Sequence, residues 1–199
     1  MTPTEFKNAW DKMGEKTSPL SPEQLAGFGL SPETARFLTE SGLPEDAAPL
    51  LSFVGNSPNT RDRIGTLSTL VRQRPDLDHL VCVGFDGEGN PIAIDTSAQD
   101  GIVWLDHEDR FTPAFMNTSI HTLAECLLHY RGFIQLIRAE NGEDAYLDSN
   151  FSEAQFNTLR DNMIRADKPA AAKGFWRDML DALQPASGQN PEKPWWKFW

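Results

Sequence analysis

Three groups of polar residues in this chain have the types and spacing that could support chemistry. The first is the loop Asp86–Asn90 (DGEGN), where acids or amides alternate as they do in a calcium-binding loop. The pattern then fails, because Pro91 stands where a sharp turn needs glycine and Ser97 stands where a bidentate glutamate is needed. The two glycines do not form a phosphate loop either, since a strand, and not a helix, is expected to follow. We therefore expect a hairpin turn.

The second group consists of His121, Glu125 and His129, spaced four residues apart on an expected helix. One helix face could present two imidazoles and a carboxylate to a metal ion. Each step of four drifts around the helix, however, and the His-Glu-X-X-His spacing of metal hydrolases is absent. The spacing favours the polar face of an amphipathic helix, and we expect no metal site.

The third group is the loop Asp106–Asp109 (DHED), in which carboxylates flank His107. Such a set could do acid–base work, but it would need a pocket and a nucleophile, and the sequence shows neither. No Gly-X-Ser-X-Gly elbow and no kinase-type set of motifs is present. A solvated loop is the favoured interpretation, and a hydrolase that uses His107 stays open as an alternative.

More acids gather at Glu140, Glu143, Asp144 and Asp148, beside the turn formed by Asn141 and Gly142. They fit either a hydrated loop between helices or a negative patch that steers a basic partner and raises its association rate. Including the two loops above and the tryptophans discussed next, the residues expected to contact a partner are Asp86, Glu88, Asp106, Glu108, Asp109, Glu140, Glu143, Asp144, Trp195, Trp196 and Trp199.

The segment PWWKFW at 194–199 places four aromatic residues among five. Tryptophan is a frequent binding hot spot, and an aromatic segment is a liability unless it docks somewhere. Docking on its own domain or on another copy of the chain is the first interpretation, and contact with a partner is the second. A homo-oligomer formed through this segment is therefore one expectation.

Three apolar runs, at 80–85, 92–94 and 102–105, are expected to form the framework between these loops. Each is rich in Val, Ile or aromatic residues, which suit strands. The glycine-containing gaps between them are too short for a parallel crossover, so the runs predict an antiparallel meander. The run at 80–85 is apolar on both faces and predicts a central strand. Pro113 makes Phe111–Phe115 an edge strand at best.

Helices are expected around this meander. Thr2, Ser21 and Ser31 each precede a proline in a helix-start pattern. A long helix at about 118–138 should lay an apolar stripe on the sheet, and Asn141-Gly142 should end it. Residues 47–53 fit a helix or a strand, and a strand is predicted near Leu67–Val71. The other expected helices lie at about 3–13, 22–27, 32–40, from Ser152 onward, and 174–183, before a linker at 185–194.

The fold expectation is α+β: N-terminal helices, an antiparallel meander sheet of about four to six strands, and a long helix packed on one face. Residues 1–184 are expected to form a single domain, and residues 185–199 a linker and aromatic tail. Cys82 and Cys126 lie among apolar neighbours and should be free, buried thiols.

The composition is acidic, with 29 Asp or Glu against 18 Lys or Arg and a net charge of −11 in 199 residues. A negative field of this size repels nucleic acid and anionic membranes and attracts basic partners. No run of 18 apolar residues is present, and the first ten residues lack the apolar core of a secretory signal. A cytoplasmic location is expected.

The order and wording of several motifs resemble the SUKH superfamily, most closely its bacterial immunity proteins, over about residues 5–135. The motifs are Gly42-Leu43-Pro44, Val83–Gly87 (VGFDG), Pro91–Thr96 (PIAIDT), Val103–Asp106 (VWLD), Asn117–Ile120 (NTSI) and Leu123–Tyr130 (LAECLLHY). The resemblance implies a binding protein that neutralises a cognate toxin, and neither catalysis nor a cofactor. A basic toxin such as a nuclease or nucleic-acid deaminase is expected. The alternative is a regulatory scaffold or adaptor like the Smi/Knr-type members, acting in cell-wall synthesis or signalling.

Overall fold

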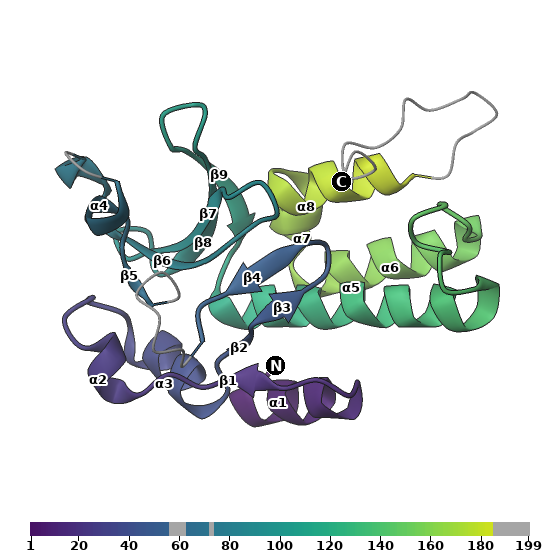
Figure 1. Cartoon of the computed structure of the whole chain (residues 1–199), viewed down its shortest axis with the longest axis horizontal. Coiled ribbons are helices and arrows are strands. Elements are labelled where there is room, and N and C mark those ends of the chain that lie inside the picture. Colours follow the sequence, from purple (N-terminus) through teal and green to yellow (C-terminus); the bar gives the residue numbers. More distant parts are fainter. Residues whose placement is uncertain (56–62, 72–73, 185–199) are drawn as a thin grey trace.

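The predicted meander forms most of the main sheet (Figure 1). The computed structural model describes residues 1–55, 63–71 and 74–184. Four consecutive strands pair antiparallel, each with the next: β6 (Leu80–Phe85), β7 (Pro91–Asp95), β8 (Gly101–Asp106) and β9 (Thr112–Asn117). The expectation of a hairpin-built α+β fold is confirmed. The strand containing Pro113 also lies at the sheet edge, as expected.

Three short segments widen this sheet beyond the four to six strands expected, to seven strands in the described residues. They are β3 (Asp46–Ala47), β4 (Leu51–Phe53) and β5 (Gly65–Thr66), of which β4 and β5 both pair with β6. Residues 47–53, left open between helix and strand, thus belong to a β3–β4 hairpin. A separate two-stranded sheet joins β1 (Thr17–Ser18) to β2 (Leu43–Pro44).

The strand predicted near Leu67–Val71 is wrong, because Leu67–Leu70 forms the short helix α4. The weak alternation of that segment suggested a strand, yet Leu67 and Leu70 are also three residues apart, which suits one helical turn. Leu67 packs with Leu77 of η2 (Pro75–Leu77) over one face of the sheet. Tertiary burial of this leucine decides the local structure.

The central strand β6 is covered on both faces, as its sequence predicts. Val81 and Val83 belong to the main core, whereas Leu80 packs in a smaller cluster with α4 and η2. β4 approaches β6 so closely that a Cβ at Gly84 would lie 2.4 Å from the backbone oxygen of Ser52. This contact fixes the β3–β4 hairpin against the meander.

The N-terminal helices begin at the predicted prolines. They are α1 (Pro3–Lys12), α2 (Pro22–Leu25) and α3 (Pro32–Glu40). The hydroxyls of Thr2, Ser21 and Ser31 each accept a hydrogen bond from the third helical amide, which satisfies an otherwise orphaned donor. These helices are therefore set by local sequence.

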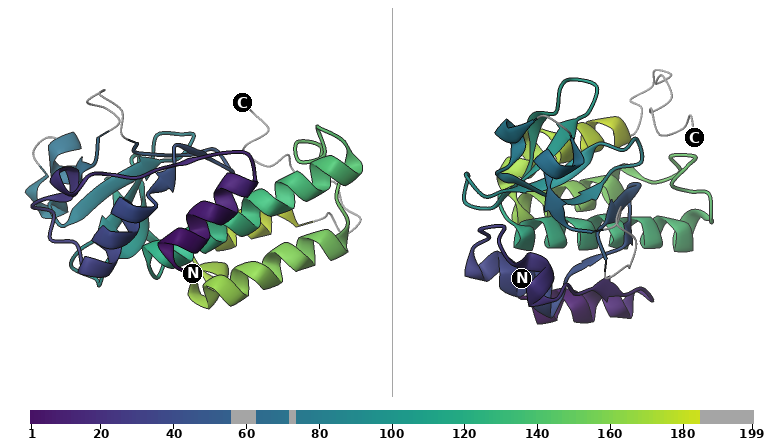
Figure 2. Two further views of the ribbon diagram at one scale, coloured as in Figure 1. Left: turned by 90° about the horizontal axis from the view of Figure 1, so that it is seen from below. Right: turned by 60° about the vertical axis from the view of Figure 1, so that its left-hand side comes forward.

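The C-terminal part is a layer of helices around the long helix (Figure 2). It contains α5 (Ile120–Asn141), α6 (Glu153–Ala166), α7 (Lys168–Ala172) and α8 (Phe175–Leu183), of which α7 was not predicted. The expected apolar stripe of α5 is buried. The helix contacts strands β8 and β9, and it also contacts helices α1 and α6. Within the described residues, no helix is long and apolar enough to cross a membrane.

A buried polar network, which we call the Asp167 network, ties these helices to the end of β9. The Asp167 carboxylate accepts hydrogen bonds from Asn117 Nδ2 at 3.1 Å and from the Thr118 amide at 2.7 Å. Trp176 Nε1 donates to Asn117 Oδ1 at 2.7 Å. Cys126 adjoins the network, with its sulfur 3.4 Å from Asn117 Nδ2. These bonds link residues about fifty positions apart and anchor α7 and α8.

Both cysteines are free and buried, as the sequence predicts. Burial raises the pKa of the Cys82 and Cys126 thiols to about 12. Because the thiolate is the reactive form of cysteine, both side chains behave as small apolar groups at neutral pH.

Candidate functional site

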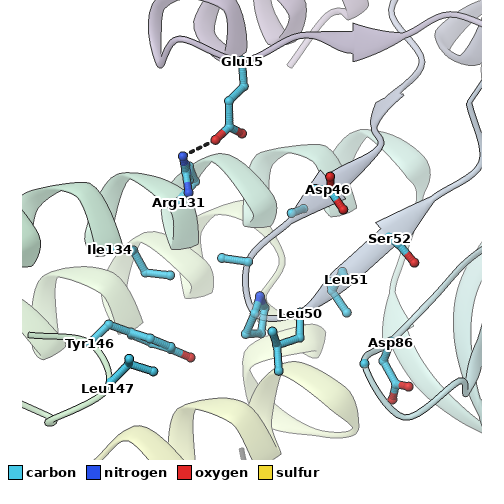
Figure 3. A pocket seen from close by; sticks show the side chains of 14 residues that line it. Glu15, Asp46, Leu50, Leu51, Ser52, Asp86, Arg131, Ile134, Tyr146 and Leu147 are labelled. Atoms are coloured by element: carbon cyan, nitrogen blue, oxygen red, sulfur yellow. Dashed lines mark hydrogen bonds and ion pairs between the residues drawn. The ribbon is translucent and has the colours of Figure 1, made fainter. Parts of the chain in front are cut away.

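A cavity of about 540 Å³ lies between the β3–β4 hairpin, α5 and the loop that follows α5 (Figure 3). We call it the hairpin groove. Leu50 and Leu51 line it from the hairpin, Ile134 from α5, and Tyr146 and Leu147 from the loop. The groove therefore brings together segments separated by up to 132 residues in the sequence, since its lining also includes Glu15.

Two leucines on facing walls of the groove are exposed to an unusual degree. Leu50 is 53% exposed and Leu147 is 55% exposed. Leu50 also has a φ angle of +66°, a left-handed conformation that costs a side-chain-bearing residue about 1–2 kcal/mol. The absence of a side chain at Gly87 leaves room for Leu50, since a Cβ at Gly87 would lie 3.1 Å from the Cβ of Leu50. The hairpin thus displays an apolar side chain at the cost of a strained backbone and of apolar surface left in water.

The rim of the groove is mainly acidic. Glu15, Asp46 and Asp86 contribute carboxylates, and Arg131 contributes a guanidinium that is already ion-paired with Glu15 (Figure 3). The hydroxyl of Tyr146 lies 2.9 Å from that of the buried Tyr130, and burial raises the pKa of Tyr146 to about 12. At neutral pH the groove is a neutral apolar surface bordered by net negative charge.

Asp86 is only 8% exposed and is saturated by hydrogen bonds. Its carboxylate accepts from the amides of Glu88 and Asn90, both at 2.9 Å, from Asn90 Nδ2 at 3.0 Å, and from Trp104 Nε1 at 2.7 Å. Asp86 also borders a second cavity of about 290 Å³, lined by Trp104 and by Phe175 of α8. The predicted calcium-like loop is thus a hairpin turn, as the sequence favours, and its first acid organises that turn.

The turns β6–β7 and β8–β9 lie at the same end of the meander and are joined by Asn90. Asn90 Oδ1 accepts from the His107 amide at 3.0 Å and lies 2.6 Å from His107 Nδ1. Asp106 Oδ1 in turn accepts from the Glu108 amide at 2.8 Å. The structure therefore gathers five of the expected contact acids in two connected turns, with Glu88, Glu108 and Asp109 exposed.

The other expected acids lie apart from these turns. Glu140, Glu143 and Asp144 are exposed at the outer end of α5 and in the following loop, away from the sheet (Figure 1). Glu140 accepts a hydrogen bond from Gln155 Nε2 at 2.6 Å, and Glu143 is ion-paired with Arg138. The hairpin groove lies between this loop and the meander. Trp195, Trp196 and Trp199 lie outside the described residues.

The histidines of α5 do not converge on one point. His121 Nδ1 lies 2.8 Å from the backbone oxygen of Met1, and its Nε2 lies 3.3 Å from Glu33. His129 lies 4.0 Å from Glu125, and burial lowers its pKa. In the part of the chain that the structure describes, no group of three or more His, Cys, Asp or Glu side chains could hold a metal ion.

The sequence reasoning missed the groove itself. The one sequence signal for the groove was Leu147, an apolar residue among the acids of the predicted negative loop. Leu50 and Arg131 gave none, because their role depends on how the hairpin and α5 are placed relative to each other. Asp86 was identified as an acid in a turn, but its burial could not be read from the sequence.

Comparison with known families agrees with the resemblance found in the motifs. The model of the SUKH-4 immunity protein family matches residues 9–182, which include the meander, the groove, α5 to α7 and all of α8 except its last residue. No curated protein and no solved structure matches the chain. The match covers most of the sequence, and the chain belongs to the SUKH-4 immunity protein family.

Proposed function

We propose that this protein binds a cognate toxin and neutralises it by steric and electrostatic occlusion, without a chemical step. The toxin in this proposal is a basic protein that acts on nucleic acid, as a nuclease or a deaminase does, and the acidic surface covers its substrate channel. Membership of the immunity protein family supports the binding role. The distribution of charge supports the choice of toxin.

The observation that carries the proposal is the concentration of charge in and around the meander. Residues 75–109 contain nine Asp or Glu and no Lys or Arg, while the other 164 residues contain 20 acids and 18 bases. Almost the whole net charge of −11 thus belongs to one segment of the fold. A local field of one sign raises the encounter rate with an oppositely charged partner and disfavours nucleic acid itself.

The acidic turns are also held in fixed positions. The bonds of Asn90 to Asp86 and His107 connect the two turns, so their exposed acids need little ordering when a partner arrives. Pre-organisation lowers the entropic cost of binding. A rigid negative edge suits occlusion of a basic channel better than a flexible acidic tail would.

The test is co-expression with the protein encoded by the neighbouring gene, scored by rescue of growth and by a complex that co-purifies. The charge part is tested with a triple variant, Glu88→Gln, Glu108→Gln and Asp109→Asn, in which each side chain is exposed. We expect the association rate to fall about tenfold or more at low salt, and the deficit to shrink as salt is added.

The matched control removes three exposed carboxylates elsewhere, by Asp11→Asn, Glu153→Gln and Asp161→Asn. An equal fall in both triple variants would mean that net charge alone matters, and would contradict a role for the turns. Binding of several cellular proteins without any rescue would favour the adaptor alternative.

A further inference from the structure

We propose that the hairpin groove receives a segment of the toxin in which an apolar side chain is flanked by a lysine or arginine. The apolar side chain lies between Leu50 and Leu147, and the cation faces the acidic rim at Asp46 and Asp86 (Figure 3). This inference rests on the proposed function, since it names the chemistry by which the toxin is held.

Displaying these two leucines to solvent costs the free protein stability or solubility. Exposed large apolar side chains are individually common, but here two of them, from different segments of the chain, line one cavity. Leu50 adds a left-handed backbone, which glycine would adopt without strain. A leucine that is both exposed and held in a conformation suited to glycine supports a contact with a partner at this position.

The charges that line the groove are complementary to a positively charged segment. Three carboxylates line the groove against one guanidinium, and Arg131 is already paired with Glu15. A partner segment with a positive charge gains attraction here, whereas an acidic or purely apolar segment meets uncompensated negative charge. The groove rim and the neighbouring meander are both negatively charged, so one basic partner can bind to both surfaces.

The size of the cavity restricts the occupant. At about 540 Å³ the groove falls in the range typical of sites that bury a small molecule. It therefore holds a few side chains of a loop or strand end, and not a whole helix. The remaining toxin surface lies against the turns outside the groove.

The experiment compares Leu50→Asp and Leu147→Asp with Leu70→Asp in the full-length protein. Leu70 is 45% exposed and lies on α4, outside the groove, so it matches the other two in type, exposure and charge change. The probe is the toxin domain encoded by the neighbouring gene, and the readout is its Kd together with growth rescue. We expect each groove variant to raise Kd at least about tenfold, as hot-spot changes do, and the control to stay within about twofold.

A photo-reactive amino acid at position 50 provides the second measurement. We expect it to cross-link to the toxin, next to a lysine or arginine, and the same group at position 70 to give no such product. Cross-linking of position 50 to residues 195–199 in the presence of toxin would identify the aromatic segment as the occupant and overturn the inference.

Failure of the groove and failure of the function are distinguishable. If the wild-type protein neither binds the toxin domain nor rescues growth, the proposed function is overturned. If the wild type rescues and both groove variants bind equally well, the toxin is held elsewhere and only the groove assignment falls. Thermal melting of every variant separates loss of binding from loss of folding.

Discussion

Asp86 and Asp167 are both nearly buried carboxylates, with 8% and 3% exposure, and each is saturated by hydrogen bonds. The partners of Asp86 lie within 18 residues of it in the sequence, and the side chain borders two surface cavities. The partners of Asp167 include Asn117 and Thr118, about fifty residues away, and join β9 to the C-terminal helices. The same chemistry thus shapes a local surface in one place and connects distant layers in the other.

The largest expected effect comes from breaking the Asp167 network. Asp167→Ala leaves Asn117 Nδ2 and the Thr118 amide without their acceptor in a buried site, which costs about 3 kcal/mol or more of unfolding free energy. Urea unfolding would measure it, with the exposed Asp148→Ala as control, for which a change below about 0.5 kcal/mol is expected. A similar small loss for Asp167→Ala would remove the distinction between the two aspartates.

An alkaline titration sharpens the same contrast through Cys126, which contacts Asn117. Burial raises the pKa of this thiol from 9.0 to about 12, so the unfolded chain releases its proton at lower pH than the folded chain does. The thiol's contribution to the unfolding free energy is fully present below pH 9 and is lost as the pH rises toward 12. At pH 10.5 the loss is about 2 kcal/mol.

Urea midpoints measured between pH 8 and 11 would check this, with Cys126→Ala as the comparison. The variant should show a shallower alkaline decline in unfolding free energy, because the other groups that titrate at alkaline pH, such as Cys82 and Tyr146, are unchanged. Equal slopes in the two proteins would show that Cys126 does not titrate differently in the folded and unfolded states.

Replacing Asp86 should cost less than replacing Asp167. Asp86→Ala removes the acceptor for Trp104 Nε1 and for two turn amides, but water can reach these groups through the adjoining cavities. A loss of about 1–2 kcal/mol is expected in urea unfolding, together with weaker toxin binding. Toxin affinity unchanged in a folded Asp86→Ala protein would argue against a role for this edge.

Leu50→Gly should shift stability in the opposite direction. Relief of the left-handed backbone stabilises the fold by up to about 1 kcal/mol, partly offset by the greater freedom of glycine in the unfolded chain. Toxin binding should weaken at the same time. Differential scanning calorimetry and a binding titration would show this opposition, and Leu136→Gly on α5, where glycine disfavours the helix, would be destabilised instead.

The smallest effect is expected from the aromatic segment at 194–199, which lies outside the described residues. Deleting residues 195–199 should lower the melting temperature or change the oligomeric state, because four aromatic side chains gain by docking. Scanning fluorimetry and analytical ultracentrifugation would test both outcomes. If neither changes, docking of this segment on its own domain or on another copy is excluded.

The parts of the fold that follow local rules were predictable. The meander followed from Val- and Ile-rich runs with gaps too short for a crossover, and the helix starts followed from Ser or Thr before proline. The segment at Leu67 was not predictable, because four residues carry too little periodicity to separate a turn of helix from a strand.

The site was less predictable than the fold. Acids in turns can be recognised from the sequence, and Glu88 and Glu108 are exposed in the positions that this implies. The groove depends on where Leu50 comes to lie relative to Leu147, which the packing of the hairpin against α5 determines. No short-range pattern encodes that distance, so the apolar contacts of the candidate site emerge only in three dimensions.

The edges of the main sheet determine how a partner can be recognised. At one edge, β9 contains Pro113, which has no N–H to offer, and α7 and α8 contact the strand. At the other edge, β3 is only two residues long. A further short strand, β5, pairs with β6 beside β4 and is also only two residues long. Strand addition, which pairs main chains and tolerates many sequences, is therefore disfavoured at these edges. A protein held by this surface is then chosen mainly by its side chains, so a few substitutions should suffice to redirect its selectivity toward a related toxin.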